Sequence, residues 1–276
     1  MGLPEPGPHT TCLVTGASSG IGAHIARELA ARRLGLVLVA RRRDRLQALA
    51  DELSAAHRVR VEVVPADLAD ERSRAALPDA VADLGLTVEV LVNNAGLTTL
   101  GPVHRADRQA ELRVVRTDVE AVVDLCTMFV PGMATRRRGA VLNTASTAAF
   151  QPLPGQAVYG GSKAFVVSYT YALRAELRPA GVAVTALCPG PVETGFAEAA
   201  GMSEAEAASA LPRFMWVPAD QVARAGVEGL DHDRAIVIPG AANRLGAVGA
   251  QLAPRSVVTA ILARQHPGLQ GTAPDR

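Results

Sequence analysis

Short apolar runs alternate with longer amphipathic stretches along most of the chain. Apolar runs of about four to eight residues are typical of buried strands, whereas apolar positions spaced three or four apart over longer stretches indicate helices. Strands are therefore expected at residues 11–14, 36–39, 61–64, 88–92, 140–143 and 182–187. Helices are expected near residues 20–32, 43–56, 105–129 and 159–178.

This alternation predicts an α/β fold built on a doubly wound parallel sheet. Near-continuous apolar strands are typical of a parallel sheet covered by helices on both faces, and right-handed crossovers place the helices there. We expect a single Rossmann-type three-layer α/β/α domain at residues 10–242, because neither a repeat nor a low-complexity linker divides the 276 residues. A flexible tail at 1–9 and a helical extension with a tail at 243–276 are expected to flank it.

A glycine-rich turn follows the first expected strand and opens the first expected helix. Residues 15–22 read TGASSGIG, with the spacing Gly-x-x-x-Gly-x-Gly. A helix N-terminus offers free N–H groups and partial positive charge to a pyrophosphate, and glycine allows close backbone approach. The alternative is a glycine-rich turn with no ligand. The candidate cofactor-binding residues are Gly16, Ser18, Ser19, Gly20, Ile21 and Gly22.

The end of the second expected strand indicates which dinucleotide is bound. NAD-binding chains usually place a carboxylate there for the ribose 2′-hydroxyl, whereas this chain has Ala40 followed by Arg41. A guanidinium binds a 2′-phosphate in bidentate fashion, so the sequence favours NADP(H), with Arg41 on the phosphate. Arg42 or Arg43 is expected to be solvated at the start of the next helix.

Candidate acid–base chemistry lies in a helix further along the chain. Tyr159 and Lys163 are four residues apart, so a helix places them on one face, and Ser146 precedes the tyrosine by thirteen residues. A free phenol has a pKa near ~10, and a neighbouring ammonium and a cationic nicotinamide ring would lower it. The serine hydroxyl can hold a substrate oxygen while the proton moves.

Composition and charge exclude several other classes of function. The net charge of +1 gives no indication of nucleic-acid binding, and charged, glycine or proline positions interrupt every candidate membrane span. The first ten residues lack the pattern of a signal peptide, so we expect a cytoplasmic protein. Three unpaired cysteines and six scattered histidines predict neither disulfides nor a metal site.

In these motifs the chain resembles the single-domain short-chain dehydrogenases/reductases over about residues 9–240. Its further similarities are short strings that each follow an expected strand: DL at 67–68, NNAG at 93–96 and PGPV at 189–192. The resemblance implies an adenine contact at the first, adenosine and central-strand packing at the second, and a nicotinamide contact at the third and at residue 194. The residues concerned are Asp67, Leu68, Asn94, Ala95, Gly96, Pro189, Gly190, Val192 and Thr194.

One position departs from the family pattern. The resemblance implies an asparagine on the long helix, which holds a water that relays protons toward the lysine, but this chain has Asp118 there. A carboxylate near Lys163 would strengthen the ammonium and shift the pH optimum. We expect a retuned relay; the alternative is that Asp118 has no role in it.

The implied reaction is a hydride transfer between a nicotinamide and a carbonyl or secondary alcohol. Ser146 would bind the substrate oxygen, Tyr159 would donate the proton, and Lys163 would lower the tyrosine pKa and hold the nicotinamide ribose. Apolar residues along the expected substrate wall favour an apolar substrate, and residues 203–211 are expected to form a short lid helix. The candidate wall residues are Phe150, Leu153, Phe196 and Trp216.

Two questions stay open at the level of sequence. The apolar positions of residues 243–264 suggest helices around Pro254, which could cover the substrate pocket, contact a partner subunit or rest on a membrane surface. The resemblance implies a homodimer or homotetramer. A non-catalytic NADP-binding regulator of the same fold is the alternative function, supported by Asp118 and opposed by the intact Ser146, Tyr159 and Lys163.

Overall fold

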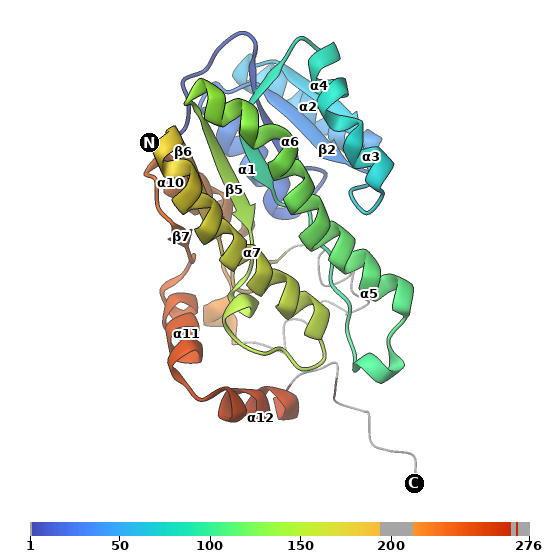
Figure 1. The fold of residues 1–276 in the computed structure, drawn as a ribbon, viewed down its shortest axis with the longest axis vertical. Helices are drawn as coiled ribbons and strands as arrows, with labels where there is room; N and C mark the ends of the chain where they lie inside the picture. Colours follow the sequence, from blue (N-terminus) through green and yellow to red (C-terminus); the bar gives the residue numbers. More distant parts are fainter. Residues whose placement is uncertain (1, 194–211, 266–268, 270–276) are drawn as a thin grey trace.

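The computed structural model describes residues 2–193, 212–265 and 269, and these residues form one parallel seven-stranded sheet (Figure 1). The strand order is β3-β2-β1-β4-β5-β6-β7, and every neighbouring pair is parallel. The predicted fold class is confirmed. The strands are β1 (Thr10–Thr15), β2 (Leu36–Ala40), β3 (Val61–Pro65), β4 (Thr87–Asn93), β5 (Gly139–Thr144), β6 (Val182–Leu187) and β7 (Ile236–Val237).

The strand predictions were accurate except at the two edges of the sheet. Strands β1, β2, β4, β5 and β6 are almost wholly buried, as expected for strands with neighbours on both sides. Strand β3 was predicted to be buried, but its residues are half-buried or exposed because it is an edge strand. Strand β7 was not predicted, since two residues are too short to form a recognisable apolar run.

Helices cover both faces of the sheet in two layers (Figure 1). Apolar side chains of α1, α2 and α10 pack in one core cluster, and those of α4, α6 and α7 pack in a second cluster on the opposite face. The helices are α1 (Gly20–Ala31), α2 (Arg43–His57), α3 (Glu71–Ala75), α4 (Leu77–Asp83), α5 (Arg108–Val115), α6 (Ala121–Arg136), α7 (Ala157–Leu177), α10 (Ala219–Asp231), α11 (Ala241–Leu252) and α12 (Arg255–Gln265).

The helix predicted at 105–129 is interrupted rather than continuous. A 3₁₀ turn η1 (Val103–Arg105) precedes α5, and a π-helical turn η2 (Arg116–Glu120) separates α5 from α6. Such π turns are rare and occur often at functional sites. Thr117 and Asp118 are buried in this turn, where the carboxylate accepts a hydrogen bond from the Leu97 N–H at 2.7 Å. The spacing of apolar residues carries no information about a polar contact of this kind, so the break in the helix was not predicted.

A chain of buried polar side chains connects the centre of the sheet to α7. The Asn93 amide donates to the Asn143 amide oxygen at 2.8 Å, and the Asn143 amide donates to the Thr170 hydroxyl at 3.0 Å. The Thr170 hydroxyl donates in turn to the Val166 carbonyl at 2.6 Å within α7. Buried polar groups are costly unless they are paired, so this chain fixes α7 against β4 and β5.

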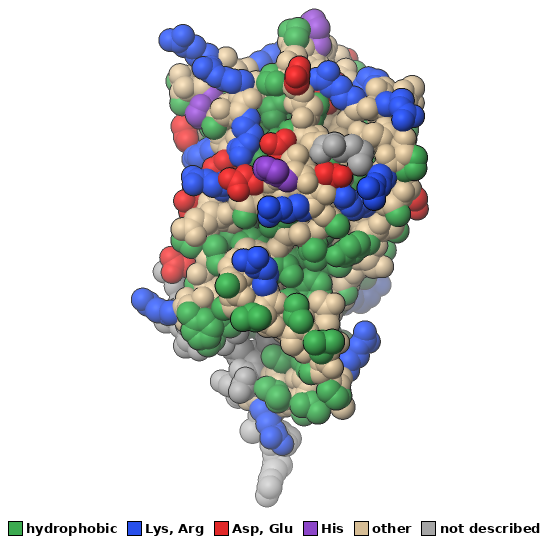
Figure 2. Space-filling view, turned by 90° about the vertical axis from the view of Figure 1, so that its left-hand side faces the viewer, with side chains coloured by type: hydrophobic (Ala, Val, Ile, Leu, Met, Phe, Trp, Pro, Cys, Tyr) green, Lys and Arg blue, Asp and Glu red, His purple; other side chains and the backbone are tan. Residues whose placement is uncertain are grey.

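The helices predicted around Pro254 are present as α11 and α12, beyond the carboxyl ends of the strands (Figure 1). Helix α11 packs against two 3₁₀ turns, η3 (Thr147–Phe150) and η5 (Arg213–Met215). Both helices also expose apolar side chains, and Figure 2 shows such side chains gathered on the lower half of one face. The lid helix predicted at 203–211 lies outside the described residues.

Candidate active site

The predicted site residues lie at the carboxyl edge of the sheet. Each candidate string follows the end of a strand, from β1 through β6. The chain changes direction at β1, whose neighbours β2 and β4 lie on opposite sides. Open α/β sheets bind their ligands in the crevice at such a switch point. The topology therefore brings strings that are far apart in the sequence to one edge of the sheet.

The glycine turn forms a tight cradle at the start of α1. Gly16 and Gly20 have positive φ angles of 66° and 56°. A Cβ at Gly22 would lie 2.4 Å from the Gly16 carbonyl oxygen, so side chains are excluded there. Helix α1 has no acidic residue in its first turn, and no side chain caps its N-terminal N–H groups. The cradle therefore fits the pyrophosphate of a dinucleotide.

Thr15, which sequence reasoning did not single out, joins this turn to the string after β4. Its hydroxyl accepts hydrogen bonds from the backbone N–H groups of Asn94 and Ala95, at 2.9 and 3.1 Å. The Asn94 side-chain amide donates to the Thr15 carbonyl at 3.1 Å. A Cβ at Gly16 would meet the Ala95 Cα at 2.9 Å. The two loops at the switch point are thus held in close contact.

Arg42, one of the two arginines of which one was expected to be solvated, contacts the glycine turn. Its Nη2 donates to the hydroxyls of Ser18 and Ser19, each at 3.0 Å, although the residue is exposed overall. Arg41 is also exposed and lies close enough to Asp67 to lower its pKa. Two guanidinium groups therefore flank the region between the turn and the end of β3.

Ser146, Tyr159 and Lys163 come together at the ends of β5 and α7. Ser146 precedes η3, and its side chain hydrogen-bonds the Tyr159 phenol. The Lys163 ammonium is buried and lies 5.6 Å from the centroid of the Tyr159 ring. It also donates to the Thr144 carbonyl at 3.3 Å, a contact that the sequence did not predict. One proton donor, one hydroxyl and one ammonium thus share a small volume.

The chain alone does not lower the Tyr159 pKa in the way expected from the sequence. Burial raises the pKa of Tyr159 and is the largest influence. Lys163 and the hydrogen bond from Ser146 lower the Tyr159 pKa, whereas Asp118 and Cys188 raise it further. The net effect is a raised pKa. A raised pKa keeps the phenol protonated at neutral pH, as a proton donor requires.

Asp118 forms a buried ion pair with Lys163. The Oδ2–Nζ distance is 2.9 Å, and the side chains are 0% and 5% exposed. Burial lowers the pKa of Lys163, but Asp118 and Tyr159 outweigh it, so the pKa is raised. Burial raises the pKa of Asp118, and Lys163 only partly offsets this. A Cβ at Gly96 would lie 3.1 Å from both charged groups, so the backbone at Gly96 packs closely against the ion pair.

The string at 189–192 lies beside these residues. The Pro189 carbonyl accepts from the Thr147 N–H at 2.8 Å and from the Ser146 hydroxyl at 3.4 Å. A Cβ at Gly190 would lie 2.4 Å from the side chain of buried Asn243, so the first turn of α11 supports this string. Thr194, predicted to contact the nicotinamide, lies outside the described residues.

Three predicted wall residues are described, and all are half-buried. Phe150 ends η3, and Leu153 lies against Gly160 of α7, where an added Cβ would approach it to 3.0 Å. Trp216 follows η5, and the next residue donates its N–H to the Pro191 carbonyl at 3.1 Å. Trp216 thus adjoins a residue that is hydrogen-bonded to the segment at 189–192, and Phe150 ends the turn whose first residue, Thr147, is also bonded to it. Phe196 lies outside the described residues.

The described residues contain neither a metal-binding cluster nor a helix that could span a membrane. Among them no group of three or more His, Cys, Asp or Glu side chains is arranged to hold a metal ion. No helix in the described part of the chain is long and apolar enough to cross a membrane.

Comparisons with known proteins identify the family of the chain. The chain matches the family model "short chain dehydrogenase" over residues 10–205. It is 39% identical to sulfoacetaldehyde reductase 2 of Chromohalobacter salexigens, over 67% of this chain and 73% of that protein. It is also 39% identical to the NADP-dependent 3-hydroxy acid dehydrogenase of Salmonella typhi, over 65% and 71% of the two chains. A short-chain dehydrogenase from Sphingobium yanoikuyae, solved in complex with NADPH, superimposes with a TM-score of 0.78 at 31% identity, covering 97% of this chain and 99% of that one.

Proposed function

The chain belongs to the short-chain dehydrogenase family, and we propose that it is an NADP(H)-dependent oxidoreductase acting on a carbonyl or secondary alcohol of an apolar substrate. The observation that carries this proposal is the cluster of Ser146, Tyr159 and Lys163 at the switch-point edge. It supplies an acid, an oxygen-binding hydroxyl and a cation beside a turn shaped for a dinucleotide.

Each residue of the cluster has its own role in the proposed reaction. The chemistry that NADPH would supply when bound is the transfer of a hydride to the carbonyl carbon. The Ser146 hydroxyl binds and orients the carbonyl oxygen, and Tyr159 Oη donates its proton to that oxygen. The Lys163 ammonium lowers the cost of the resulting phenolate and holds the nicotinamide ribose hydroxyls. Asp118 holds the ammonium through the 2.9 Å ion pair. We infer that it also takes part in the relay that returns a proton to Tyr159 after turnover.

The proposed cofactor contacts follow the order of the strands. The glycine turn, from Gly16 to Gly22, would bind the pyrophosphate. Arg41, together with Arg42 on Ser18 and Ser19, would bind the 2′-phosphate, which favours NADP(H) over NAD(H). The NADPH complex of the Sphingobium yanoikuyae relative supports this choice. The other proposed contacts are Asp67, Leu68, Asn94, Ala95, Gly96, Pro189, Gly190, Val192 and Thr194.

The proposed substrate preference rests on the apolar wall. Phe150, Leu153 and Trp216 are half-buried, and Phe196, the fourth proposed wall residue, lies outside the described residues. Helix α11 packs on η3 and η5, which carry or adjoin two of these residues. We infer that the C-terminal extension contributes to the substrate pocket. A homodimer or homotetramer in the cytoplasm remains our expectation.

The test is an assay of NADPH oxidation with a panel of carbonyl compounds. The panel should contain apolar aldehydes and ketones, together with anionic ones such as sulfoacetaldehyde. Turnover that is greatest with apolar members would support the proposal, and turnover confined to anionic members would contradict the substrate class. Tyr159→Phe should abolish turnover while NADPH binding stays nearly intact. Binding of NADPH by the wild type without oxidation across the panel would favour the regulator.

A further inference from the structure

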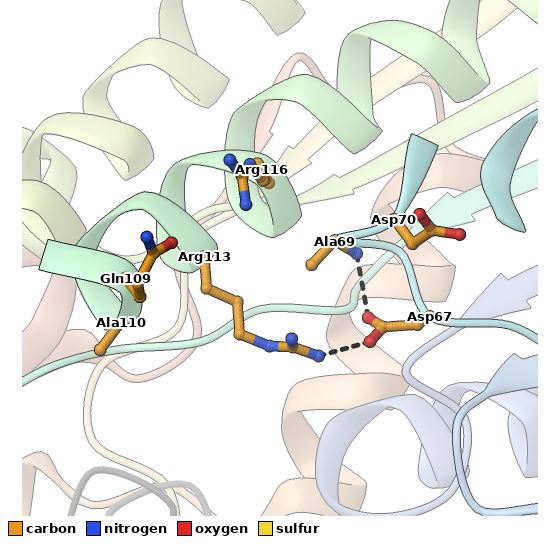
Figure 3. Close-up of a pocket in the computed structure, with 7 residues that line it drawn as sticks. All are labelled: Asp67, Ala69, Asp70, Gln109, Ala110, Arg113 and Arg116. Carbon is orange, nitrogen blue, oxygen red and sulfur yellow. Dashed lines mark hydrogen bonds and ion pairs between the residues drawn. The ribbon is translucent and has the colours of Figure 1, made fainter. Parts of the chain in front are cut away.

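A pocket of about 290 Å³ lies between the loop after β3 and the first turns of α5. Figure 3 shows the side chains of Asp67 and Arg113 pointing toward one another, one from each element, with Arg116 on the helix side. Arg113 and Asp67 form an ion pair there. The pair joins two segments that are separated by 46 residues in the sequence.

Topology places this pocket at the adenine end of the proposed dinucleotide site. In Rossmann-type sheets the pyrophosphate lies at the turn after the first strand, and the adenosine ribose lies at the end of the second. Strand β3 is the next strand outward, in the order β3-β2-β1, and Asp67 follows its end. Arg41 at the end of β2 is near enough to lower the Asp67 pKa. The base beyond the ribose therefore reaches Asp67.

The Asp67 carboxylate is held on both of its oxygens. Oδ1 accepts from the Ala69 N–H at 3.0 Å, and Oδ2 pairs with Arg113, while the Asp67 N–H donates to the Ser73 hydroxyl at 3.0 Å. A carboxylate has about four acceptor positions, so this held group keeps the capacity to accept further N–H donors. The Asp67 and Arg113 side chains are 37% and 41% exposed, so a ligand can reach both.

The Asp67 side chain is in the ionised state, in which it accepts hydrogen bonds. Burial alone would raise the pKa of Asp67, but the Ala69 N–H and the Arg113 guanidinium outweigh it, and the pKa is lowered. The carboxylate is therefore ionised at neutral pH and can only accept hydrogen bonds. The 6-amino group of adenine is a donor. Hypoxanthine carries a carbonyl oxygen at the same position and would face the carboxylate acceptor to acceptor.

We propose that Arg113 is a specificity-determining residue for the cofactor, because it orients the Asp67 carboxylate toward the 6-amino group of adenine and forms the outer wall of the adenine pocket. The inference rests on the proposed function and deepens it. Without Arg113 the carboxylate would be held by the Ala69 backbone N–H alone and could turn into solvent. Binding of adenine over hypoxanthine would then weaken, while the glycine turn and the catalytic cluster would be unchanged.

Arg116 provides a matched control. It lines the same pocket from the same side and carries the same charge, but Asp67 pairs with Arg113 and not with Arg116 among the described contacts. Replacing either arginine by methionine removes one positive charge from the pocket and keeps the side chain long. Only Arg113→Met removes the anchor of the carboxylate.

The experiment measures the dissociation constants of NADPH and of its hypoxanthine analogue, deamino-NADPH, by nicotinamide fluorescence. The proteins compared are the wild type, Arg113→Met, Arg116→Met, Asp67→Asn and the double variant of Asp67 and Arg113. Circular dichroism melts confirm folding, which a half-exposed ion pair affects little. We expect the wild type to prefer NADPH by about tenfold or more, as for the loss of one hydrogen bond to a charged group.

Arg113→Met should weaken NADPH binding by about fivefold, which is near the upper limit for the contribution of a partly exposed charge pair. This variant should also lose most of the wild-type preference for NADPH over deamino-NADPH. Arg116→Met should keep the preference, and the double variant should resemble Asp67→Asn, because the pair acts as a unit. Equal affinity of the wild type for both nucleotides, an unchanged preference in Arg113→Met, or the same loss in Arg116→Met would each overturn the inference and leave the proposed function standing. Failure of the wild type to bind NADPH at all would overturn both.

Discussion

Replacing Asp118 by asparagine tests the buried ion pair at the proposed catalytic centre. The change restores the residue that the family pattern implies, yet the structure predicts a loss rather than a gain. Both neighbours of the carboxylate are donors: the Leu97 N–H at 2.7 Å from Oδ1 and the Lys163 ammonium at 2.9 Å from Oδ2. An amide has one acceptor oxygen and one donor NH₂, so it can satisfy only one of these neighbours.

The structure sets the size of the expected effect. Both side chains of the pair are almost wholly buried, and removing one partner of a buried pair costs about 3–5 kcal/mol of stability. Asp118 also raises the pKa of Tyr159, which burial already raises most, and raises the pKa of Lys163. Losing that charge therefore makes the coupled pair release its first proton at lower pH than in the parent.

The sign of the kinetic effect follows from the role of Tyr159 as the acid. Reduction requires the protonated phenol, so its rate falls as pH rises through the pKa of the pair. In Asp118→Asn this fall should begin at lower pH than in the parent. The assay is the pH dependence of kcat/KM for carbonyl reduction, combined with thermal melts of both proteins.

Asp124→Asn is a suitable control for this variant. Asp124 lies on α6, the helix that follows the π turn, and pairs with Arg74 at 2.7 Å away from the catalytic cluster. It should lower stability without moving the pH profile. Superimposable pH–rate curves for the parent and Asp118→Asn would refute the reasoning, whatever the change in stability. A shift of equal size in Asp124→Asn would refute it as well.

Three further predictions follow from other contacts. Gly22→Ala should abolish NADPH binding, measured by fluorescence titration, because its Cβ would meet a backbone oxygen at 2.4 Å; unchanged affinity would contradict the cradle. Arg42→Ala should raise the KM for NADPH by about tenfold with little change for NADH, since a charged hydrogen bond to the 2′-phosphate is worth about 1.5–3 kcal/mol; equal changes for both cofactors would count against it. Asn143→Ala should lower the free energy of unfolding by about 1–3 kcal/mol in urea titrations, because Asn93 and Thr170 lose a buried partner; a neutral result would show that the chain of amides is dispensable.

Apolar periodicity was sufficient to predict the layered fold. Strands and helices of this type differ in the spacing of their apolar positions, and the buried strands were predicted to within one or two residues. The two edge strands of the sheet were predicted less well, because β3 is only half-buried and β7 has two residues. The break between α5 and α6 was also missed, because Asp118 is held in the π turn by Leu97 and Lys163, contacts that helical spacing does not encode.

The α/β architecture, the glycine turn and the candidate acid–base group can be predicted from local patterns, because each depends on spacing within one strand–turn–helix or one helix. The partners of those residues depend on how the whole chain packs. Arg42 rather than solvent lies against the serines of the turn, Thr15 joins the two central loops, and Arg113 holds Asp67. Packing also determines that burial outweighs Lys163 in setting the Tyr159 pKa. Burial and contacts between distant segments arise only when the chain is packed, so no local pattern contains them.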